Sequence, residues 1–295
     1  MAVFLSAVGF GVVTAAILAI SAVGFTLQFS VTNVFNLSFG SLMTICGFIA
    51  YWLNQDAVNI WAAMAVAAVA GGVISLALNE LVFAPFIRHG LNLFGMVIIT
   101  ISVGLIADHS LQALVGPSFF AYNAPAGKAF HFADFVLTAQ ELAIIGIALL
   151  LTAAVQVGLQ YTRIGRAMRG LAVNAPLARA CGVPTRRVIA LAWFVSGVLA
   201  GIGGVALFLD ISTFTATTGS EFLIVIIAAA VLGGIGSARG AVLGALVVGI
   251  VTEVGAAYWN PELKDVLAFG VLIVVLLVRP QGLFAQLATE RALAR

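Results

Sequence analysis

Charged residues are scarce in this chain. They make up 8% of its 295 residues, whereas hydrophobic residues make up 63%, and the mean hydropathy is +1.19. A soluble domain carries about 25% charged residues, because polar groups have to cover its surface. The composition therefore excludes a soluble globular domain and predicts an integral membrane protein.

Cysteine and lysine are also scarce, which excludes several kinds of site. The two cysteines, Cys46 and Cys181, lie far apart without a CxxC spacing, so neither a disulfide framework nor a metal site is expected. The two lysines, Lys128 and Lys264, belong to no GxxxxGK(S/T) loop for a nucleotide. No Ser/His/Asp arrangement with a recognisable local context occurs either. We expect a chain without enzyme activity, metal, cofactor or nucleic-acid partner.

Long apolar runs fill most of the chain. A helix needs about 20 residues to cross roughly 30 Å of hydrocarbon. Only helical bundles and closed barrels satisfy the backbone in lipid, and the runs lack the alternation of strands. We therefore predict an all-α, polytopic transmembrane bundle of eight or nine spans, forming a single domain over residues 1–295. The predicted spans are 5–29, 34–53, 58–83, 93–116, 135–160, 188–209, 221–236, 240–258 and 264–279.

The basic residues predict the orientation of the chain, since short cytoplasmic loops are rich in Lys and Arg. Placing the arginine-bearing loops inside puts the amino terminus outside and the carboxyl terminus inside. The first basic residue is Arg88, so the amino-terminal run lacks the charged start of a signal peptide and is expected to remain as a span. Loop 117–134 is the longest external segment, and its Pro, Gly and Asn predict irregular structure.

One segment, residues 162–187, contains six of the chain's 13 basic residues and no acid; we call it the basic loop. Arg163, Arg166 and Arg169 are three residues apart, so a helix would carry them on one broad face. We expect this helix to continue the fifth span past the membrane, where arginines meet lipid headgroups. Topology alone could account for these three arginines.

The remainder of the basic loop needs another explanation. Asn174 and Pro176 predict the start of a short helix that runs to Ala180. Gly182 suits a left-handed residue that ends this helix, and Pro184 separates it from the next span. A short capped helix between two spans is typical of a surface that docks another protein.

Polar residues inside apolar runs are candidates for a solute pathway, because placing them in hydrocarbon is costly. Asn33, Asn36 and Ser38 form one such group, and residues 33–41 are expected to break the helix at membrane depth. The alternative is an ordinary helix start, where Asn and Ser serve as caps.

Three ionisable residues also fall within predicted spans. Asp108 and His109 lie in the fourth span, and Glu253 lies in the eighth. These residues could pair structurally with one another or with the backbone, or they could have a functional role.

Two sets of glycines predict helices that approach one another closely. They are Gly197, Gly201 and Gly204 on the sixth span, and Gly236, Gly240 and Gly244 at the eighth. The glycine-rich segment 233–237 is predicted to be a tight turn between the seventh and eighth spans.

The basic loop resembles the cytoplasmic loop of branched-chain amino-acid ABC transporter permeases, most closely that of the LivH-type subunit. The residues that carry this resemblance are Gly165, Arg166, Ala167, Met168, Arg169, Asn174, Ala178, Gly182 and Val183. Pro176-Leu177-Ala178-x-x-x-Gly182 stands where bacterial ABC importer permeases have the EAA…G coupling motif, and only the second Ala and the Gly match.

Further matches extend the resemblance from about residue 15 to residue 285. They are Leu232-Gly233-Gly234-Ile235-Gly236-Ser237 with Gly240-Ala241, Lys264-Asp265-Val266, the tail Arg279-Pro280-Gln281-Gly282-Leu283-Phe284, and Asn36-x-x-x-Gly40. Each motif is weak alone, but the combination is specific.

The resemblance implies an ABC importer permease-like fold and a subunit in the bacterial inner membrane. It would move branched-chain or similar amino acids, driven by ATP hydrolysis on partner chains through the 174–183 helix. The expected partners are a companion permease, two cytoplasmic ATPase subunits, an external (periplasmic) substrate-binding protein and membrane lipid. The ATPase-coupling residues would be Gly165, Arg166, Arg169, Asn174, Ala178 and Gly182. The substrate pathway would include Asn33, Asn36, Ser38, Phe39 and Asp108.

One departure leaves the substrate open. The family's usual N-F-A-H-G-E stands here as residues 36–41, NLSFGS, so Phe39 and Ser41 replace two ionisable residues. A permease for urea or short amides is therefore an alternative. So is an ion-coupled carrier or channel without an ATPase, in which Asp108 or Glu253 would bind the coupling cation.

Overall fold

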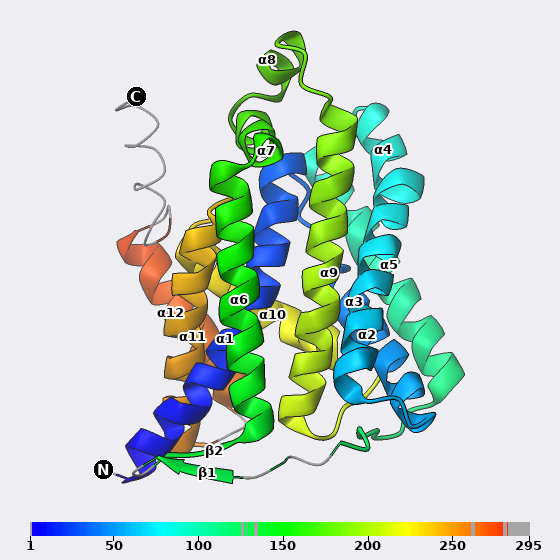
Figure 1. The fold of residues 1–295 in the computed structure, drawn as a ribbon. Coiled ribbons are helices and arrows are strands. Elements are labelled where there is room, and N and C mark those ends of the chain that lie inside the picture. Colours follow the sequence, from blue (N-terminus) through cyan, green and yellow to red (C-terminus); the bar gives the residue numbers. More distant parts are fainter. Residues whose placement is uncertain are drawn as a thin grey trace. The chain divides into compact units, whose positions relative to one another are not determined.

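The computed structural model describes residues 2–124, 127, 129–132, 135–260, 263–279 and 282, and helices account for most of them (Figure 1). In chain order the helices are α1 Ala2–Thr32, α2 Phe39–Gln55, α3 Ile60–Leu78, the π-helical turn η1 Asn79–Phe83, α4 Ala84–Arg88, α5 Leu93–Val115, α6 Ala139–Tyr161, α7 Arg163–Val173, α8 Ala175–Ala180, α9 Thr185–Ile211, α10 Thr218–Gly233, α11 Ala238–Tyr258 and α12 Lys264–Val278. The predicted all-α bundle is confirmed.

Each of the nine predicted spans overlaps a helix. Among the described residues, six helical stretches are long and apolar enough to cross a membrane: Phe4–Thr32, Ile60–Arg88, Leu93–Val115, Ala139–Tyr161, Thr185–Ile211 and Ala238–Tyr258. The other three predicted spans form the shorter helices α2, α10 and α12, of 17, 16 and 15 residues. The predicted number of eight or nine spans is therefore approximate.

The predicted start of the fifth span, residue 135, was too early. Residues 135–138 form strand β2 (Phe135–Thr138), which pairs antiparallel with β1 (Ala129–Phe132) inside the segment predicted to be irregular. Helix α6 begins only after Thr138, where a capping box forms. The Thr138 amide donates to Glu141 Oε2 at 2.7 Å, and the Glu141 amide donates to Thr138 Oγ1 at 3.2 Å. Lys128 and Asp134 lie outside the described residues.

The chain divides into two compact units, and α1, α6 and α10 contribute residues to both. Unit 1 comprises Met1–Thr26, Ala124–Ala153 and Ile224–Arg295, and unit 2 comprises Leu27–Asn123 and Ala154–Leu223. Unit 2 contains all of the residues proposed for coupling and for the solute pathway.

In unit 1, small residues bring α10 and α11 together. A Cβ added to Gly240 or Gly244 would overlap the backbone carbonyl of Gly233 or Ala229. The predicted tight turn at 233–237 is confirmed, and Ser237 Oγ caps α11 by accepting from the Gly240 amide at 3.2 Å. Gly236 belongs to this turn, with φ 93°, so its predicted place on the packing face was wrong.

In unit 2, α3 and α9 pack with their backbones in contact. A Cβ on Gly71 would lie 2.5 Å from the carbonyl oxygen of Gly197, and one on Gly201 would lie 2.6 Å from that of Ala67. Ser75 Oγ adds a hydrogen bond of 2.8 Å to the carbonyl of Trp193. The predicted close approach at the sixth span is therefore confirmed, and it makes α3 and α9 a tightly joined pair.

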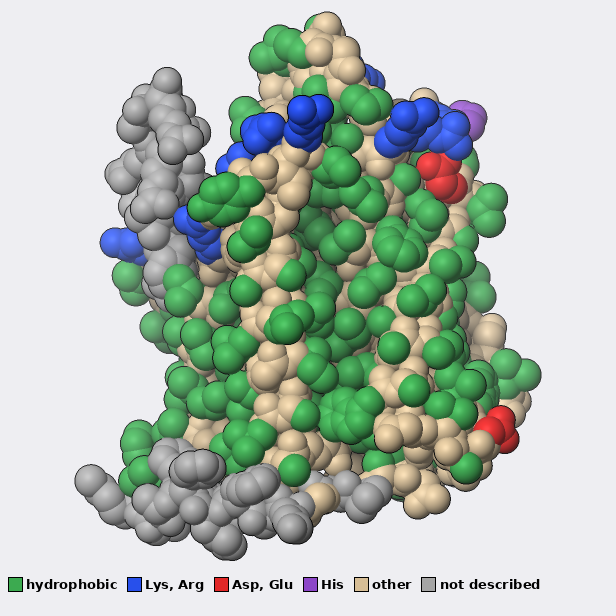
Figure 2. Space-filling view, viewed as in Figure 1, with side chains coloured by type: hydrophobic (Ala, Val, Ile, Leu, Met, Phe, Trp, Pro, Cys, Tyr) green, Lys and Arg blue, Asp and Glu red, His purple; other side chains and the backbone are tan. Residues whose placement is uncertain are grey.

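Exposed side chains on the long helices are largely apolar, as lipid contact requires. On α5 they include Ile98, Leu105, Ile106 and Leu114, of which Leu114 is 79% exposed. A soluble protein rarely leaves such large apolar surface uncovered. Figure 2 shows apolar side chains over α3 and α9, and Lys and Arg side chains gathered near α4 and α7. In unit 2 the basic side chains are thus concentrated at helix ends.

Candidate functional site

The basic loop begins with a separate helix, so the expectation that it continues the fifth span was wrong. Helix α6 ends at Tyr161, and Thr162 adopts an extended conformation that caps α7. Its Oγ1 accepts from the Gly165 amide at 2.9 Å and donates to the Gly158 carbonyl at 2.6 Å. The Thr162 hydroxyl thus caps both the end of α6 and the start of α7.

Gly165 allows α7 to lie directly against the end of α6. A Cβ at this position would collide with the backbone of Gly158 and would lie 2.5 Å from the carbonyl oxygen of Leu159. Backbone cannot move aside as a flexible side chain can. Glycine is therefore required at residue 165 for this fold, which gives the residue a structural role beside its proposed coupling role.

The arginines of α7 are exposed, and two of them reach back to α6. Arg166 Nη1 donates to the Tyr161 carbonyl and Arg169 Nη2 to the Gln160 carbonyl, both at 3.4 Å. These carbonyls lie in the last turn of α6, where the helix dipole favours positive charge. The opposite face of α7 is buried through Gly165, Met168 and Leu171. The predicted single basic face is confirmed.

Helix α8 forms as predicted for residues 174–183. Asn174 Oδ1 accepts from the Leu177 amide at 3.0 Å, and Pro176 lies in the first turn. Gly182 has φ 79°, a left-handed conformation that L side chains rarely adopt, and the Val183 amide donates to the Ala178 carbonyl at 3.1 Å. This is the geometry of a glycine-terminated helix.

The base of the basic loop is fixed by a small apolar core in unit 2. Buried residues of α1, α7, α8 and α9 meet there: Leu27, Val31, Met168, Leu171, Ala178, Val188 and Ala192. In contrast, Leu177 on α8 is 60% exposed. Ala178 thus holds α8 to the core, while its neighbour Leu177 is available to a partner.

An ion pair joins the start of α9 to η1. Arg186 Nη2 lies 2.8 Å from Glu80 Oε2, and Arg186 Nε lies 3.4 Å from Glu80 Oε1. The π-helical turn interrupts the helix 60–88 at this point, and Glu80 belongs to that turn. The sequence analysis did not find this pair, because no local pattern relates two residues 106 positions apart.

The segment between α1 and α2 is a break whose polar groups bond locally. Asn33 is exposed and ends α1 with φ 54°. Asn36 is buried, its Nδ2 donates to Gln28 Oε1 at 3.2 Å, and its Oδ1 accepts from Ser38 Oγ at 2.6 Å. Phe39 is completely buried. The predicted break is present, and the contacts of Asn36 and Ser38 stabilise it.

A polar cluster on unit 2 joins α2, α5 and α10. Ser220 Oγ donates to Asp108 Oδ2 at 2.7 Å, and Ser41 Oγ lies 3.1 Å from Ser220 Oγ. Ser41 Oγ also donates to the Gly104 carbonyl at 3.2 Å. The other carboxylate oxygen, Asp108 Oδ1, is shielded from solvent and has no hydrogen-bond donor among the described residues. Among the described residues, therefore, only one of the two Asp108 carboxylate oxygens has a hydrogen-bond donor.

Close contact between two glycines holds this cluster together. A Cβ on Gly40 would lie 2.5 Å from the Gly219 carbonyl oxygen, and the Gly219 amide donates to Thr44 Oγ1 at 3.1 Å. Ser41 and Ser220 follow these glycines directly in the chain. The sequence analysis singled out Gly40 but missed Gly219 and Ser220, since neither carries a local signal.

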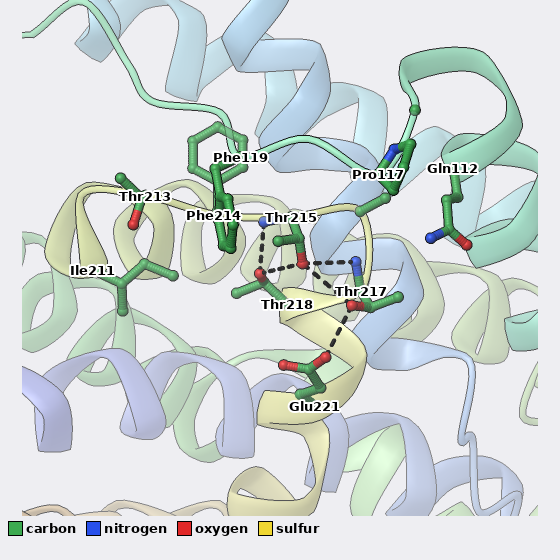
Figure 3. Close-up of a pocket in the computed structure, with 12 residues that line it drawn as sticks. Gln112, Pro117, Phe119, Ile211, Thr213, Phe214, Thr215, Thr217, Thr218 and Glu221 are labelled. Atoms are coloured by element: carbon green, nitrogen blue, oxygen red, sulfur yellow. Dashed lines mark hydrogen bonds between the residues drawn. The ribbon is translucent and has the colours of Figure 1, made fainter. Parts of the chain in front are cut away.

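Next to this cluster is a pocket of about 440 Å³, which we call the threonine pocket (Figure 3). Its walls are the end of α5, the loop that follows α5, the segment before α10 and the first turn of α10. The lining residues are Gln112, Gly116, Pro117, Phe119, Ile211, Thr213, Phe214, Thr215, Ala216, Thr217, Thr218 and Glu221.

Hydrogen bonds within the threonine pocket use most of its donors. The Thr215 amide donates to Thr218 Oγ1 at 2.9 Å, and Thr217 Oγ1 donates to Glu221 Oε1 at 2.9 Å. The hydroxyls of Thr215 and Thr218 are 3.1 Å apart (Figure 3). These bonds hold the segment before α10 against the first turn of the helix.

Aromatic packing fixes the loops of the threonine pocket. Phe214 stacks on Phe208 at 4.1 Å, and Phe120 and Phe214 exchange two backbone hydrogen bonds of 2.9 Å. Tyr122 Oη donates to the Gly47 carbonyl at 2.9 Å. Burial raises the pKa of the Tyr122 phenol well above its ordinary value, so the hydroxyl keeps the proton that it donates.

In unit 1, Glu253 has structural partners. Its Oε1 lies 2.6 Å from Lys264 Nζ and accepts from Thr14 Oγ1 at 3.0 Å. Within the described ranges, no group of three His, Cys, Asp or Glu side chains is placed to hold a metal ion.

The chain matches one family of proteins over most of its length. The family model described as "Branched-chain amino acid transport system / permease component" matches residues 7–276. The chain is 28% identical to the high-affinity branched-chain amino acid transport system permease protein LivH of Escherichia coli (strain K12), over 95% of each chain. It is 26% identical to the high-affinity branched-chain amino acid transport system permease protein BraD of Pseudomonas aeruginosa, over 92% of this chain and 93% of that one.

A relative with a different cargo in its name also matches. The chain is 27% identical to the ribose import permease protein RbsC of Escherichia coli (strain K12), over 80% of this chain and 73% of that one. No solved structure shows a significant match.

Proposed function

Because the chain belongs to the family of branched-chain amino acid transport system permease components, we propose that it is the transmembrane permease subunit of an ABC importer. It is a multi-pass protein of the inner membrane, and its cargo is a branched-chain or similar amino acid. The partners are a companion permease, two cytoplasmic ATPase subunits and a periplasmic substrate-binding protein.

The observation that carries the proposal is the geometry of α8. It is a capped helix outside the membrane spans, and it exposes Leu177 while Ala178 anchors it to the core below. A helix held in this way can receive force from another protein and pass it to the spans. Gly165, Arg166 and Arg169 support this by fixing α7 to the end of α6.

In this mechanism the ATPase subunits close when they bind ATP and move α8. Helix α9 begins three residues after Gly182 and is packed backbone to backbone against α3, so the motion of α8 reaches both helices as a rigid body. The spans then change access from one side of the membrane to the other. Asn33, Asn36, Ser38, Phe39 and Asp108 remain our proposed residues of the pathway.

The ion-coupled alternative has less support. The relatives named above are permease proteins of transport systems or import permeases, and Glu253 is already paired with Lys264 and Thr14. The ribose relative shows that cargo differs between similar chains.

Substitution of Gly182 tests the coupling role. A Cβ there meets no atom within 4 Å, so the constraint is its left-handed backbone and not space. Gly182→Val should strain α8 by about 1–3 kcal/mol, whereas Gly182→Asn should be tolerated, because Asn adopts this conformation more readily. We expect ATP-driven leucine uptake by the assembled importer to fall about tenfold in Gly182→Val and to persist in Gly182→Asn. Equal uptake by Gly182→Val and the parent chain, at equal membrane levels, would contradict the proposal.

A further inference from the structure

A small charged cluster lies where two of the long apolar stretches of unit 2 end. Arg88 is the last residue of the stretch Ile60–Arg88, and Arg186 is the second residue of the stretch Thr185–Ile211. Glu80 Oε2 lies 2.8 Å from Arg186 Nη2, and Arg88 is near enough to Glu80 to interact electrostatically. We call Glu80, Arg88 and Arg186 the surface cluster, and Figure 2 shows basic side chains with acidic ones beside them near α4. The ends of the two stretches place the surface cluster at the membrane surface.

The turn between α4 and α5 keeps Arg88 at this surface. The Gly90 amide donates to the Ile87 carbonyl at 3.1 Å, and the Leu91 amide donates to the Phe86 carbonyl at 3.3 Å. Gly90 has φ 76°, so α4 ends in a left-handed glycine. Helix α5 begins only two residues after Leu91. Because the connection is this short and this well bonded, the exposed Arg88 side chain stays next to the lipid.

The charges of the surface cluster do not cancel. Arg186 donates to both carboxylate oxygens of Glu80, from Nη2 at 2.8 Å and from Nε at 3.4 Å. Arg88 is exposed, and within the described ranges its guanidinium has no hydrogen-bond acceptor. Two arginines against one glutamate leave one positive charge, and the five N–H donors of Arg88 are available to a ligand. A phosphodiester carries one negative charge and accepts from arginine in a bidentate way.

Large apolar side chains border the surface cluster. Leu81, Phe86 and Phe94 are 77%, 41% and 73% exposed. They belong to η1, α4 and the first turn of α5, and so they lie close in sequence to Glu80 and Arg88. A surface that faces water rarely exposes such large apolar groups together, whereas acyl chains would cover them. The surface cluster is therefore better suited to a lipid than to a free phosphate ion or a soluble protein.

We propose that the surface cluster binds the phosphodiester headgroup of an anionic phospholipid, with Arg88 holding the phosphate and the apolar side chains of α4 and α5 against the acyl chains. Basic sites between membrane helices are a known way to bind such headgroups. The phosphate competes with Glu80 for Arg186, so the bound lipid loosens the link between η1 and the start of α9. This inference goes beyond the proposed function, because it needs neither the ATPase nor the cargo.

The test uses the purified full-length chain and native mass spectrometry with two lipids that have the same acyl chains. Phosphatidylglycerol has a net negative charge, whereas the choline of phosphatidylcholine cancels that of its phosphodiester. We expect phosphatidylglycerol to be retained about tenfold more, since hydrogen bonds to charged groups are the strong ones. Equal retention of the two lipids would overturn the inference.

A headgroup without acyl chains distinguishes a lipid from a free anion. Glycerophosphoglycerol is the headgroup of phosphatidylglycerol with its phosphodiester intact. We expect it to bind at least tenfold more weakly than the lipid, because it cannot cover the apolar side chains of α4 and α5 (on the order of). Binding as tight as that of the lipid would overturn the inference and identify a site for a soluble anion.

Two variants and a control locate the binding. Arg88→Gln removes the unpaired charge and should weaken retention of phosphatidylglycerol about fivefold. Glu80→Gln removes the competing carboxylate and should strengthen it about threefold. Arg179→Gln, on α8 and also exposed, is the matched control and should leave lipid retention unchanged. Arg88 and Arg179 are exposed, so both arginine variants should fold normally.

Equal retention of phosphatidylglycerol by Arg88→Gln and Arg179→Gln would overturn the inference. So would unchanged or weaker retention by Glu80→Gln, because a purely structural role of this residue predicts no gain. If Arg88→Gln retains the lipid but no longer binds the ATPase subunits, the surface cluster docks a protein and the lipid site is overturned. The lipid measurements need no ATPase, so their failure is distinct from a failure of ATP-driven uptake, which would overturn the proposed function instead.

Discussion

The basic loop and the threonine pocket belong to the same unit, but they are built in different ways. The basic loop is made by neighbours in sequence: Asn174 caps α8 three residues on, and Gly182 ends it. The pocket is made by residues that are distant in sequence, because Gln112 and Glu221 both line it. The basic loop presents exposed arginine side chains and an exposed apolar side chain, whereas the threonine pocket presents hydrogen-bond acceptors.

This difference predicts which substitutions will damage each region. The basic loop depends on caps and turns, so a single local change should shift α8 without disturbing the spans. The polar cluster beside the threonine pocket depends on close packing of α2 against α10, so a change in that packing should disturb the whole cluster. The predictions below use this difference, from the largest expected effect to the smallest.

Gly165→Val should have the largest effect. A side chain there would enter the backbone of α6, and overpacking typically costs about 1–3 kcal/mol, with backbone collisions at the upper end. We expect leucine uptake by the assembled importer to be lost. Gly170→Ala is the matched control on the same helix, where a Cβ meets no atom within 4 Å, and it should transport normally. Similar uptake by the two variants would show that the packing of α7 against α6 is unimportant.

Gly40→Ala should damage the pocket side of the comparison. The new Cβ would lie 2.5 Å from the Gly219 carbonyl oxygen and 2.8 Å from the Ser220 Cα, which pushes the first turn of α10 away. We expect a loss of about 2 kcal/mol in stability, measured by thermal unfolding. Gly146→Ala has open space and serves as the control. Equal thermal stability of Gly40→Ala and Gly146→Ala would show that this packing does not hold α10 in place.

Asn174→Ala should have a smaller and local effect. It removes the cap of α8, which is worth about 1 kcal/mol, so uptake should fall about fivefold. Asn174→Asp keeps an acceptor oxygen and should retain most of the activity. Equal uptake by Asn174→Ala and the parent chain would show that this cap does not matter for coupling.

Reversal of the Arg186–Glu80 pair should have the smallest effect. Exposed ion pairs contribute about 0–1 kcal/mol, and Arg186 is largely exposed. We expect Glu80→Arg to lower uptake about twofold, and the double variant Glu80→Arg with Arg186→Glu to restore it. A double variant as impaired as the single one would show that the pair itself does not matter.

Most of the fold could be predicted from sequence because apolar runs and helix caps are local signals. The helices at the nine predicted spans follow from apolar length, and the geometry of α8 follows from Asn174, Pro176 and Gly182. The errors were also local: Thr138 and Glu141 form a capping box that sets the start of α6, and Thr162 caps a new helix where continuity was expected.

The polar cluster beside the threonine pocket could not be predicted, for a physical reason. Ser220 is one serine in a polar segment until Gly40 and Gly219 bring it against Ser41 and Asp108. Such contacts depend on how helices pack, and packing leaves no periodic pattern in a single sequence. Asp108 was identified because an ionisable residue is costly to place in hydrocarbon. Its hydrogen-bond partners could be identified only from the structure.

The most direct test of the coupling proposal uses a residue that the chain already has. Cys181 follows α8 and is exposed, whereas Cys46 is buried, so a maleimide should modify Cys181 selectively. If α8 docks the ATPase, assembly with the ATPase subunits should slow the labelling of Cys181 on the order of tenfold, because a covered thiol reacts only when the complex opens. An unchanged labelling rate in the assembled, transport-active importer would contradict the proposal that α8 is the surface on which ATP hydrolysis acts.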